Sequence, residues 1–370
     1  MNTQNNLEIF LVAVPGAEPL LCAEAAEKGF NNPKPDTGGV TVWGDWPEVW
    51  RANLELCGAS RVLVRLGSFK VVHLAKLDKL ARRFPWAETL RSDVSVRVEA
   101  SCKKSRIYHS GAVTQRISTA ITEELGASVS TDGAVAIKVR LQNDLCTISV
   151  DTSGEGLHKR DHKQAVNKAP MRETLASLML RQCGFDGKEP VVDPMCGSGT
   201  FVIEAAEIAT GLLPGRTRHF AFEQLATFDP EVWQQMQTKT SEQEAEAHFY
   251  GFDHDSGAIR MSRDNAERAG VAALTEFQLM PISDLKSPCE TPGLVIVNPP
   301  YGARIGNIKK MKALYRSLGE TMKAQFPGWR VGVVTNTESL AKATRLPFTQ
   351  ESEDISHGGL RVKVYSTDPL

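Results

Sequence analysis

The sequence predicts two folds in one chain: an α+β region that ends near Asp151, and a doubly wound α/β region from residue 170 onward. Strands and helices are mixed in the first region. In the second, strand-then-helix units repeat, which is typical of a parallel sheet. Residues 154–170, between the two, are polar, basic and interrupted by Gly and Pro, so we interpret this segment as a linker.

Apolar patterns and turn residues predict the elements of the first region in order. Residues 93–100 alternate apolar and polar side chains, as a half-buried strand does, and the last two strands pair around Asn143-Asp144. We expect strands at 7–15, 38–45, 59–69, 93–100, 134–144 and 145–153, and helices at 17–30, 46–58 and 111–125.

The second region has longer helices and shorter, more apolar strands, and we expect its sheet to be parallel. Residues 211–248 form a long insert before its second strand. The predicted helices are 171–184, 199–211, 256–270 and 307–326, and the predicted strands are 189–195, 248–253, 276–285, 293–300, 329–336 and 361–366.

The composition is that of an ordinary globular protein. Of 370 residues, 41% are hydrophobic and 24% charged, with 43 Lys and Arg against 44 Asp and Glu. These values exclude a disordered chain, a coiled coil and a collagen-like fibre. No apolar run is long enough for a transmembrane helix, and the first residues do not resemble a secretory signal, so we expect a cytoplasmic protein. The seven cysteines lack zinc spacing; we expect reduced thiols and no metal site.

The near-neutral total hides an uneven distribution of charge. Residues 61–116 contain thirteen Lys and Arg against four Asp and Glu, whereas residues 223–255 contain eight acidic residues and one Lys. In the basic stretch, Lys103, Lys104 and Arg106 stand close to Tyr108. Phosphates attract such cations and unstacked bases stack on aromatic rings, so the stretch suggests a polyanion partner, although a solvated surface explains it equally well.

A glycine-rich turn, DPMCGSGTF, joins a predicted strand to a predicted helix. Asp193 ends the strand, while Gly197 and Gly199 allow a ligand to approach the backbone closely. The turn lacks the third glycine of a dinucleotide motif and the Lys of a phosphate loop. Asp253 and Asp284 end the next two strands, where carboxylates can hold a ribose and an adenine amino group; each alone could equally be a helix cap or a surface charge. Together they predict a nucleoside pocket.

A second motif, Asn298-Pro299-Pro300-Tyr301, follows a short apolar strand. The prolines stiffen the backbone and donate no hydrogen bond, so carbonyl oxygens near them are free to accept. The Asn298 side chain adds an acceptor, and Tyr301 offers a flat face for a ring. Two acceptors aimed at the N–H bonds of an exocyclic amino group would direct its lone pair at an electrophile, without a strong base.

These two motifs resemble those of S-adenosylmethionine-dependent amino methyltransferases. With GEGLHKRDHKQAVNKAPMRETLA and FYGFDHD, the resemblance extends over the chain to THUMP-domain RNA methyltransferases, specifically the 23S ribosomal RNA guanine-N2 methyltransferase (RlmL-like) family. It implies a ferredoxin-like part at 1–60, an RNA-binding THUMP domain at 61–155 and a Rossmann-like class I methyltransferase domain at 156–370. Some family members carry a second methyltransferase domain, which we expect to be absent because this chain ends at residue 370.

The resemblance also implies a role for each site residue. Asn298, Pro299 and Tyr301 would hold the target base, with Asn298 next to the cofactor, and Cys196 would be a small filler residue. Arg172 would assist Thr174 at the methionine carboxylate. The implied cofactor-binding residues are Thr174, Asp193, Cys196, Gly197, Gly199, Asp253, Asp284 and Asn298, and the implied RNA-binding residues are Lys103, Lys104, Arg106, Lys159, Arg160, Lys163 and Arg304.

The motifs leave alternatives open. NPPY also occurs in enzymes that methylate adenine N6 in DNA or glutamine in protein release factors, so it indicates the nitrogen and not the molecule around it. The basic first region favours RNA. Ribosomal RNA is the first expectation, transfer RNA the second, and a non-catalytic RNA-binding scaffold the third. The oligomeric state and the modified nucleotide are not predicted.

Overall fold

A computed structural model describes residues 6–164, 171–238, 245–301 and 308–370. The chain divides into two compact units. The N-terminal unit comprises Met1–Ala13, Cys22–Leu157 and Thr217–Lys239; the C-terminal unit comprises Val14–Leu21, His158–Arg216 and Thr240–Leu370. Each unit therefore takes in segments from both sides of the predicted linker.

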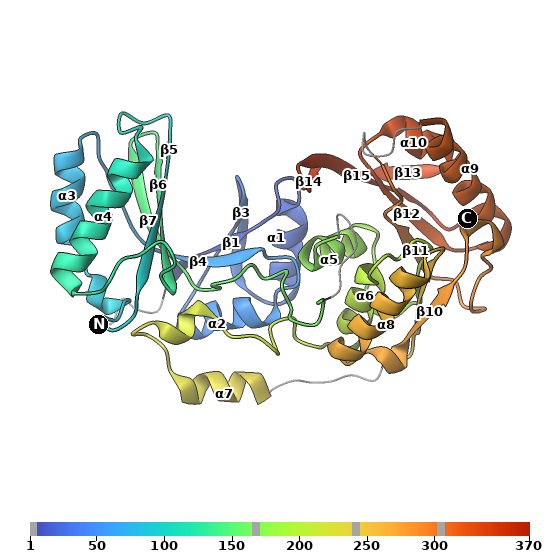
Figure 1. Cartoon of the computed structure of the whole chain (residues 1–370), viewed down its shortest axis with the longest axis horizontal. Helices are drawn as coiled ribbons and strands as arrows, with labels where there is room; N and C mark the ends of the chain where they lie inside the picture. The colour runs from blue at the N-terminus through green and yellow to red at the C-terminus, as the bar shows by residue number, and fades with distance from the viewer. Residues whose placement is uncertain (1–5, 165–170, 239–244, 302–307) are drawn as a thin grey trace. The chain divides into compact units, whose positions relative to one another are not determined.

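The N-terminal unit is built on one sheet with the strand order β2-β3-β1-β4-β7-β6-β5 (Figure 1). The β5–β6 pair is parallel and the other neighbours are antiparallel. Its strands are β1 (Leu7–Val12), β2 (Asn31–Asp36), β3 (Gly39–Gly44), β4 (Arg61–Lys70), β5 (Val96–Lys103), β6 (Val135–Gln142) and β7 (Leu145–Asp151). Its helices are α1 (Glu18–Glu27), which starts in the C-terminal unit's segment, α2 (Trp46–Glu55), α3 (Leu74–Arg82), α4 (Ser110–Leu125) and α7 (Pro230–Thr238).

Local sequence explains most of this unit. The β6–β7 turn has Asn143 and Asp144 at φ 52° and 63°, left-handed values that Asn and Asp tolerate, which confirms the predicted strand pair. The N-cap Asp45 side chain accepts the Glu48 N–H, which starts α2 at the predicted place. Strand β2 and helix α3 were not predicted. Strand β2 contains Pro33 and Pro35, and it tolerates them because it is an edge strand.

Part of the predicted insert belongs to the N-terminal unit. Phe222 stacks on Trp50 of α2 with ring centroids 5.9 Å apart, and Trp233 of α7 meets the Phe222 ring edge-on at 4.9 Å. The Phe222 N–H also donates to the Thr152 carbonyl. These contacts explain why residues 217–239 fold with the N-terminal unit although they lie between two elements of the other one.

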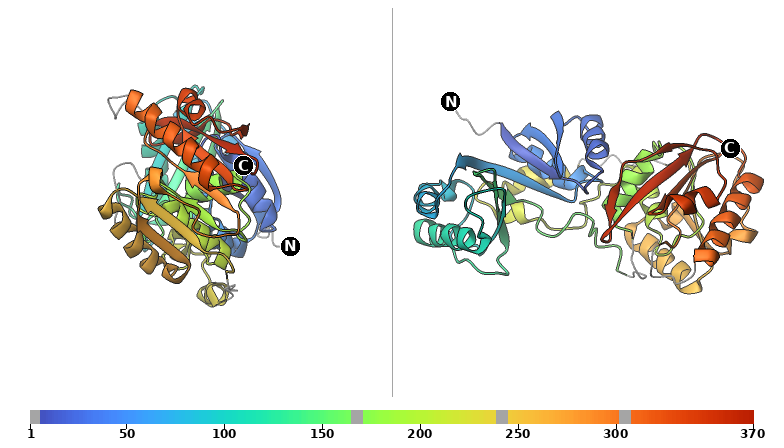
Figure 2. Two further views of the ribbon diagram at one scale, coloured as in Figure 1. Left: turned by 90° about the vertical axis from the view of Figure 1, so that its right-hand side faces the viewer. Right: turned by 90° about the horizontal axis from the view of Figure 1, so that it is seen from above.

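The C-terminal unit has a sheet with the order β10-β9-β8-β11-β12-β15-β13, and β14 pairs with β15. Figure 2 shows this unit from two further sides, with its later strands in orange to dark red. Its strands are β8 (Val191–Asp193), β9 (Phe249–Asp253), β10 (Thr275–Leu279), β11 (Leu294–Val297), β12 (Arg330–Thr335), β13 (Phe348–Glu351), β14 (Ile355–His357) and β15 (Leu360–Thr367). Its helices are α5 (Glu173–Gln182), α6 (Thr200–Thr210), α8 (Ser256–Ala269), α9 (Ile308–Gln325) and α10 (Glu338–Ala343).

The α/β prediction is confirmed, with one correction. Strands β10, β9, β8, β11 and β12 are parallel, but β15 runs antiparallel to both β12 and β13. The sheet is therefore mixed rather than wholly parallel. Strand β11 is buried along its whole length, as its four apolar residues predict. The carboxyl ends of β9, β8 and β11 lie next to one another at one edge of the sheet, which places three of the predicted site residues together.

Candidate functional site

Three polar residues mark the ends of neighbouring parallel strands in the C-terminal unit. Asp253 ends β9, Asp193 ends β8, and Asn298 follows β11. Asp193 pairs with Gly251 and Val192 with Val295, so the strands are aligned in register at this edge. Ligands of open α/β sheets bind beyond these carboxyl ends, so the three residues define a candidate ligand site.

The glycine-rich turn lies against the end of β9. The Asp253 carboxylate accepts the Gly197 N–H at 3.0 Å, and the Phe252 carbonyl accepts the Cys196 N–H at 2.9 Å. Gly197 has φ +56° with open space where a Cβ would stand, and Gly199 has φ +84° with Phe277 and Ser262 atoms 3.1 Å from that position. A ligand can therefore approach the backbone at Gly197, while Gly199 is required for packing as well as for conformation.

Helix α8 fixes the turn from the other side. Ser262 donates to the Gly197 carbonyl at 2.9 Å, and the Asn265 amide donates to the Ser198 carbonyl at 3.0 Å. Protein contacts thus hold the turn in place, which reduces the entropic cost of binding a ligand there. The Cys196 thiol lies 3.7 Å from the Ser262 hydroxyl, and burial raises its pKa, so it is an uncharged thiol at neutral pH.

Asp193 is buried beneath the turn. One of its carboxylate oxygens accepts the Met195 N–H at 3.1 Å. Burial raises the pKa of Asp193 to about 8, and the nearby Asp253 adds to this shift. A buried carboxyl with a raised pKa at a strand end is a common sign of a binding site, because a cationic ligand can stabilise its ionised form.

Two buried oxygen atoms of the predicted site have no hydrogen-bond partner among the residues that the structure describes. They are Thr174 Oγ1, in the first turn of α5, and Asn298 Oδ1. Buried polar atoms are nearly always satisfied in proteins, so each of these atoms fits a ligand that donates a hydrogen bond. Pro299 beside Asn298 is buried, and Pro300 is exposed. Tyr301 packs against the apolar core, and burial raises its pKa to about 12, so its ring is neutral.

The other predicted cofactor residues are less enclosed. Asp284 follows β10 at the same edge of the sheet, but its side chain is exposed and accepts a hydrogen bond from Ser283 at 2.9 Å. Arg172 is the N-cap residue of α5 and is exposed. Arg304 lies outside the described residues.

Two of the predicted RNA-binding residues, one buried and one half-buried, are held by carboxylates of the protein, and this is a correction. Arg160 is 2% exposed and forms ion pairs with Glu204 at 3.1 Å and Glu207 at 3.8 Å. Lys163 donates to the Met171 carbonyl and lies 3.2 Å from the Glu173 carboxylate. Neither side chain offers its charge to a phosphate, because carboxylates of α5 and α6 already hold it. Lys159 is exposed, as predicted for an RNA contact.

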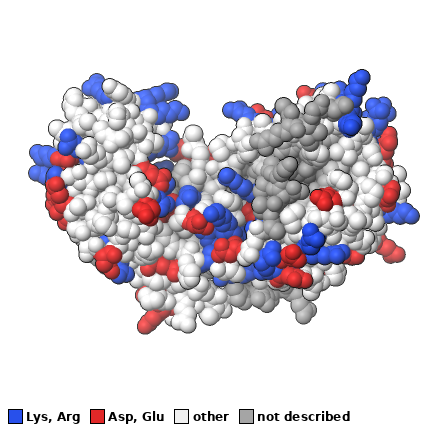
Figure 3. Space-filling view, viewed as in Figure 1, with Lys and Arg blue, Asp and Glu red and all other residues white. Residues whose placement is uncertain are grey.

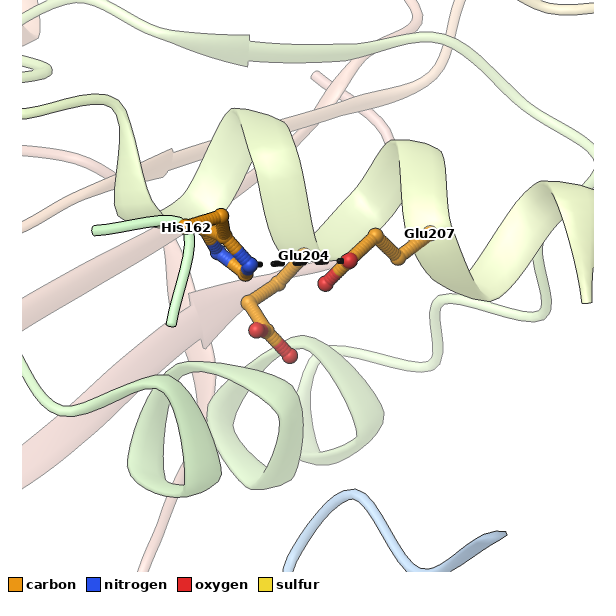
Figure 4. A group of neighbouring side chains, drawn as sticks. All are labelled: His162, Glu204 and Glu207. Atoms are coloured by element: carbon orange, nitrogen blue, oxygen red, sulfur yellow. Dashed lines mark ion pairs between the residues drawn. The ribbon is translucent and has the colours of Figure 1, made fainter. Parts of the chain in front are cut away.

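The same carboxylates form a group that sequence reasoning missed. His162, Glu204 and Glu207 are buried, and their potential metal-ligating atoms lie within 4.8 Å of one another (Figure 4). Arginine side chains already supply positive charge here, since Arg216 also contacts Glu207 at 2.5 Å. Through these ion pairs, the segment that contains Arg160 and His162 is held against α6, the helix that starts at the glycine-rich turn.

The predicted basic residues of the N-terminal unit lie at one end of its sheet. Lys103 ends β5, and Lys104 and Arg106 follow it in an exposed loop with Tyr108, which is 84% exposed. The Arg106 N–H donates to the Asp144 carboxylate at 2.7 Å, which ties the loop to the β6–β7 turn. Lys and Arg side chains gather at the upper end of the part that carries β5–β7 (Figure 3).

No helix among the described residues is both long enough and apolar enough to cross a bilayer.

Comparisons with known proteins match three parts of the chain. The model of the RMKL-like methyltransferase domain family matches residues 160–362. The RlmL ferredoxin-like domain and the THUMP domain match residues 8–63 and 72–151.

Individual relatives extend these matches. The ribosomal RNA large subunit methyltransferase K/L of Vibrio cholerae is 33% identical over 346 residues, which are 90% of this chain and 49% of that protein. The chain thus spans about half the length of the curated relatives it matches.

Two solved structures resemble the chain over nearly its whole length. A protein of Listeria monocytogenes described as a predicted N6-adenine-specific DNA methylase is 28% identical with a TM-score of 0.90, covering 99% of this chain and 97% of that chain. A methyltransferase complexed with SAH is 25% identical with a TM-score of 0.90, covering 100% and 99%. Since the first family model matches more than half of the chain, the chain belongs to the RMKL-like methyltransferase domain family and carries a ferredoxin-like and a THUMP domain before it.

Proposed function

We propose that this protein transfers a methyl group from S-adenosylmethionine to the exocyclic N2 amino group of a guanine in 23S ribosomal RNA. The observation that carries the proposal is the row of strand ends β9, β8 and β11. It places Asp253, Asp193 and the unpartnered Asn298 Oδ1 side by side next to a rigid glycine-rich turn. The names of the relatives, ribosomal RNA large subunit methyltransferases, support the substrate class.

The described residues fit the cofactor. Gly197 leaves open backbone at the turn, Asp253 at the end of β9 can accept from ribose hydroxyls, and exposed Asp284 can accept from the adenine amino group. Thr174 Oγ1 is a buried oxygen to which no described residue donates a hydrogen bond, and it suits the amino-acid end of the cofactor. The Asp193 carboxylate can balance positive charge on the cofactor. Cys196 and Gly199 form part of the wall of the cofactor pocket. When bound, the cofactor supplies an electrophilic methyl carbon on a sulfonium.

The residues after β11 position the acceptor. The Asn298 Oδ1 and the Pro299 carbonyl accept the two N–H bonds of the guanine amino group, which turns its lone pair out of the ring plane. Tyr301 stacks against the base. With the cofactor bound, the nitrogen would form its bond to the methyl carbon as the carbon–sulfur bond breaks, and the extra proton would then leave to water. Preorganised acceptors replace a general base in this step.

The N-terminal unit supports RNA as the substrate. A guanine inside folded RNA must be unstacked to reach the site, which costs a few kcal/mol. Phosphate contacts by Lys103, Lys104 and Arg106 can supply this energy. We further propose that Lys159 and Arg304 contact RNA near the site, and that the protein acts in the cytoplasm. The domain limits we propose are 1–60, 61–155 and 156–370, with residues 217–239 folding against the first two.

One experiment tests the reaction. Tritium-methyl incorporation into unmodified ribosomal RNA, followed by digestion to nucleosides, should label N2-methylguanosine. Label in transfer RNA alone would favour transfer RNA as the substrate. Label in N6-methyladenosine of DNA would overturn the proposal that the substrate is RNA. Failure to bind S-adenosylmethionine in calorimetry would instead favour a non-catalytic scaffold.

Cofactor affinity should depend on the ionisation of Asp193. Its pKa is raised to about 8, so the carboxyl is mostly protonated at pH 6 and ionised at pH 9. A cation stabilises only the ionised form, so affinity should be lost as pH falls through 8. We expect about tenfold tighter binding at pH 9 than at pH 6 by calorimetry. The cofactor's own amino group also titrates, so Asp193→Asn is the control. An identical pH dependence in that variant would contradict the role of Asp193.

Neutralising the basic loop should weaken RNA binding. We expect the triple change of Lys103, Lys104 and Arg106 to Ala to reduce the slope of log Kd against log salt by about 2, as three phosphate contacts to RNA are lost. The control neutralises Lys76, Lys79 and Arg83, which are equally exposed cations on and after α3. Equal slopes for the wild type and the loop variant would remove the loop from the interface.

A further inference from the structure

The sheet of the N-terminal unit has two unlike faces. Helices α3 and α4 lie along one face of β5–β7 (Figure 1). On β6, Val135, Ile137, Val139 and Leu141 are buried, whereas the alternate residues Lys138, Arg140 and Gln142 are exposed or half-buried. Successive side chains of a strand point to opposite faces, so the second face of the sheet is polar.

The strand register arranges this polar face in rows. Arg140 lies opposite Thr147 of β7 on one side and opposite Ser101 of β5 on the other. The three neighbouring rows across β4, β7, β6 and β5 are Ser68-Thr147-Arg140-Ser101, Arg65-Ser149-Lys138-Glu99 and Lys70-Leu145-Gln142-Lys103. We call these twelve residues the polar sheet face. Five of them are Lys or Arg and one is acidic, so the face is positively charged.

Part of the polar sheet face is the floor of a groove. The groove has a volume of about 520 Å³, and its lining also includes Asp36, the last residue of β2, and Thr37 after it. All of its lining residues belong to the N-terminal unit. It is therefore a concavity within one compact unit, separate from the methyltransferase site.

Arg140 is the cation on this floor that is free to bind a ligand. Lys138 lies 2.6 Å from the Glu99 carboxylate, and Arg65 forms an ion pair with Glu8. Arg140 is exposed and donates to the Gln142 side chain, and no carboxylate among the described residues forms an ion pair with it. Its row neighbours Ser101 and Thr147 carry hydroxyl groups that can donate to an anion.

We propose that the polar sheet face binds a single-stranded segment of the RNA substrate, with Arg140 on a phosphate and the hydroxyls of Ser101 and Thr147 on the sugar-phosphate backbone. A guanidinium flanked by hydroxyls suits a phosphodiester, and a row of such positions suits an extended strand. Lys70 and Lys103 continue the positive charge toward the exposed loop with Arg106 and Tyr108. The proposal rests on RNA being the substrate and adds where the N-terminal unit holds it.

The test compares Arg140→Ala with Arg116→Ala in the full chain. Arg116 is a partly exposed arginine on α4, the helix on the opposite face, so both variants lose one positive charge from the same unit. Binding of unmodified ribosomal RNA is measured by fluorescence anisotropy across a salt series. We expect Arg140→Ala to weaken binding about tenfold and to reduce the salt slope by about 0.7, with Arg116→Ala close to wild type. Ser101→Glu, which adds a carboxylate to the same row, should weaken binding further.

The outcomes separate this proposal from the proposed function. If the wild type methylates RNA and Arg140→Ala binds it as tightly as Arg116→Ala does, the polar sheet face is not the RNA surface and the enzyme assignment stands. If the wild type neither binds nor methylates RNA, the proposed function fails first and this inference fails with it. Unchanged S-adenosylmethionine affinity and circular dichroism in each variant show that a loss of RNA binding does not reflect misfolding.

Discussion

Replacing Asn298 with Ala should abolish methyl transfer while leaving cofactor affinity nearly intact. The variant removes the side-chain acceptor that orients the amino group, and loss of one preorganised polar group at a reacting centre costs about 10³-fold in rate. The fold should not suffer, because no described residue donates a hydrogen bond to Asn298 Oδ1. Single-turnover methyl transfer and calorimetry with S-adenosylmethionine measure the two effects separately.

Asn336→Ala is the matched control for this prediction. Asn336 follows β12, the strand beside β11, and is half-buried as Asn298 is. Its side-chain oxygen already accepts a hydrogen bond from Thr337 at 2.8 Å, whereas no described residue donates one to Asn298 Oδ1. Equal turnover by the Asn298 variant and the wild type would refute the role given to Asn298.

Features decided by local chemistry were predictable from sequence. The Asn143-Asp144 turn needs left-handed backbone, and these residue types tolerate it. The aspartates and Asn298 follow short apolar strands, so the parallel order of those strands alone brings them to one edge. The sequence also showed why Gly197 and Gly199 belong in the turn, since close backbone approach has a clear residue signature.

Features decided by distant partners were not predictable. Strand β2 was missed because Pro33 and Pro35 argue against a strand, and only its place at the sheet edge permits them. The antiparallel β15 has no local mark of its direction. Arg160 stands in a polar, basic segment that suggests solvent or RNA, yet it is buried against two residues that follow more than forty positions later.

One signal of that burial was present in the sequence. The helix FVIEAAEIA places Glu204 and Glu207 three residues apart among apolar residues, so both carboxylates lie on the same side of a helix that is buried almost throughout. Buried carboxylates need cations, and the chain offers basic residues on both sides of this helix, in the segment that contains Arg160 and at Arg216. The charged residues inside the apolar helix therefore predict the burial of Arg160 better than the polarity of the segment that contains it.

Replacing Arg160 with Met should strongly destabilise the C-terminal unit. Removing one partner of a buried ion pair leaves the other charge uncompensated and costs about 3–5 kcal/mol. The two partners differ: Glu207 keeps Arg216 at 2.5 Å, whereas Glu204 loses its ion-pair partner Arg160. Urea unfolding of the full chain and hydrogen exchange of residues 200–210 measure the effect, and the exchange data locate it in α6.

The destabilisation should grow with pH. Burial raises the pKa of Glu204, and the Arg160 guanidinium acts against that rise, so its loss raises the pKa further. A carboxyl whose pKa is higher in the folded state stabilises the fold below its unfolded pKa, and this contribution is lost as pH rises through the folded value. The Arg160 variant should therefore lose more stability at pH 8 than at pH 6.

The double variant Arg160→Met with Glu204→Gln decides whether charge or shape is responsible. A neutral amide does not need a cation, so the second change should recover most of the lost stability and remove its pH dependence. Equal stability of the single and double variants at pH 8 would show that Arg160 acts through its packing volume alone. Because α6 starts at the glycine-rich turn, the same pair should also change cofactor affinity in parallel: weaker in the single variant and restored in the double one.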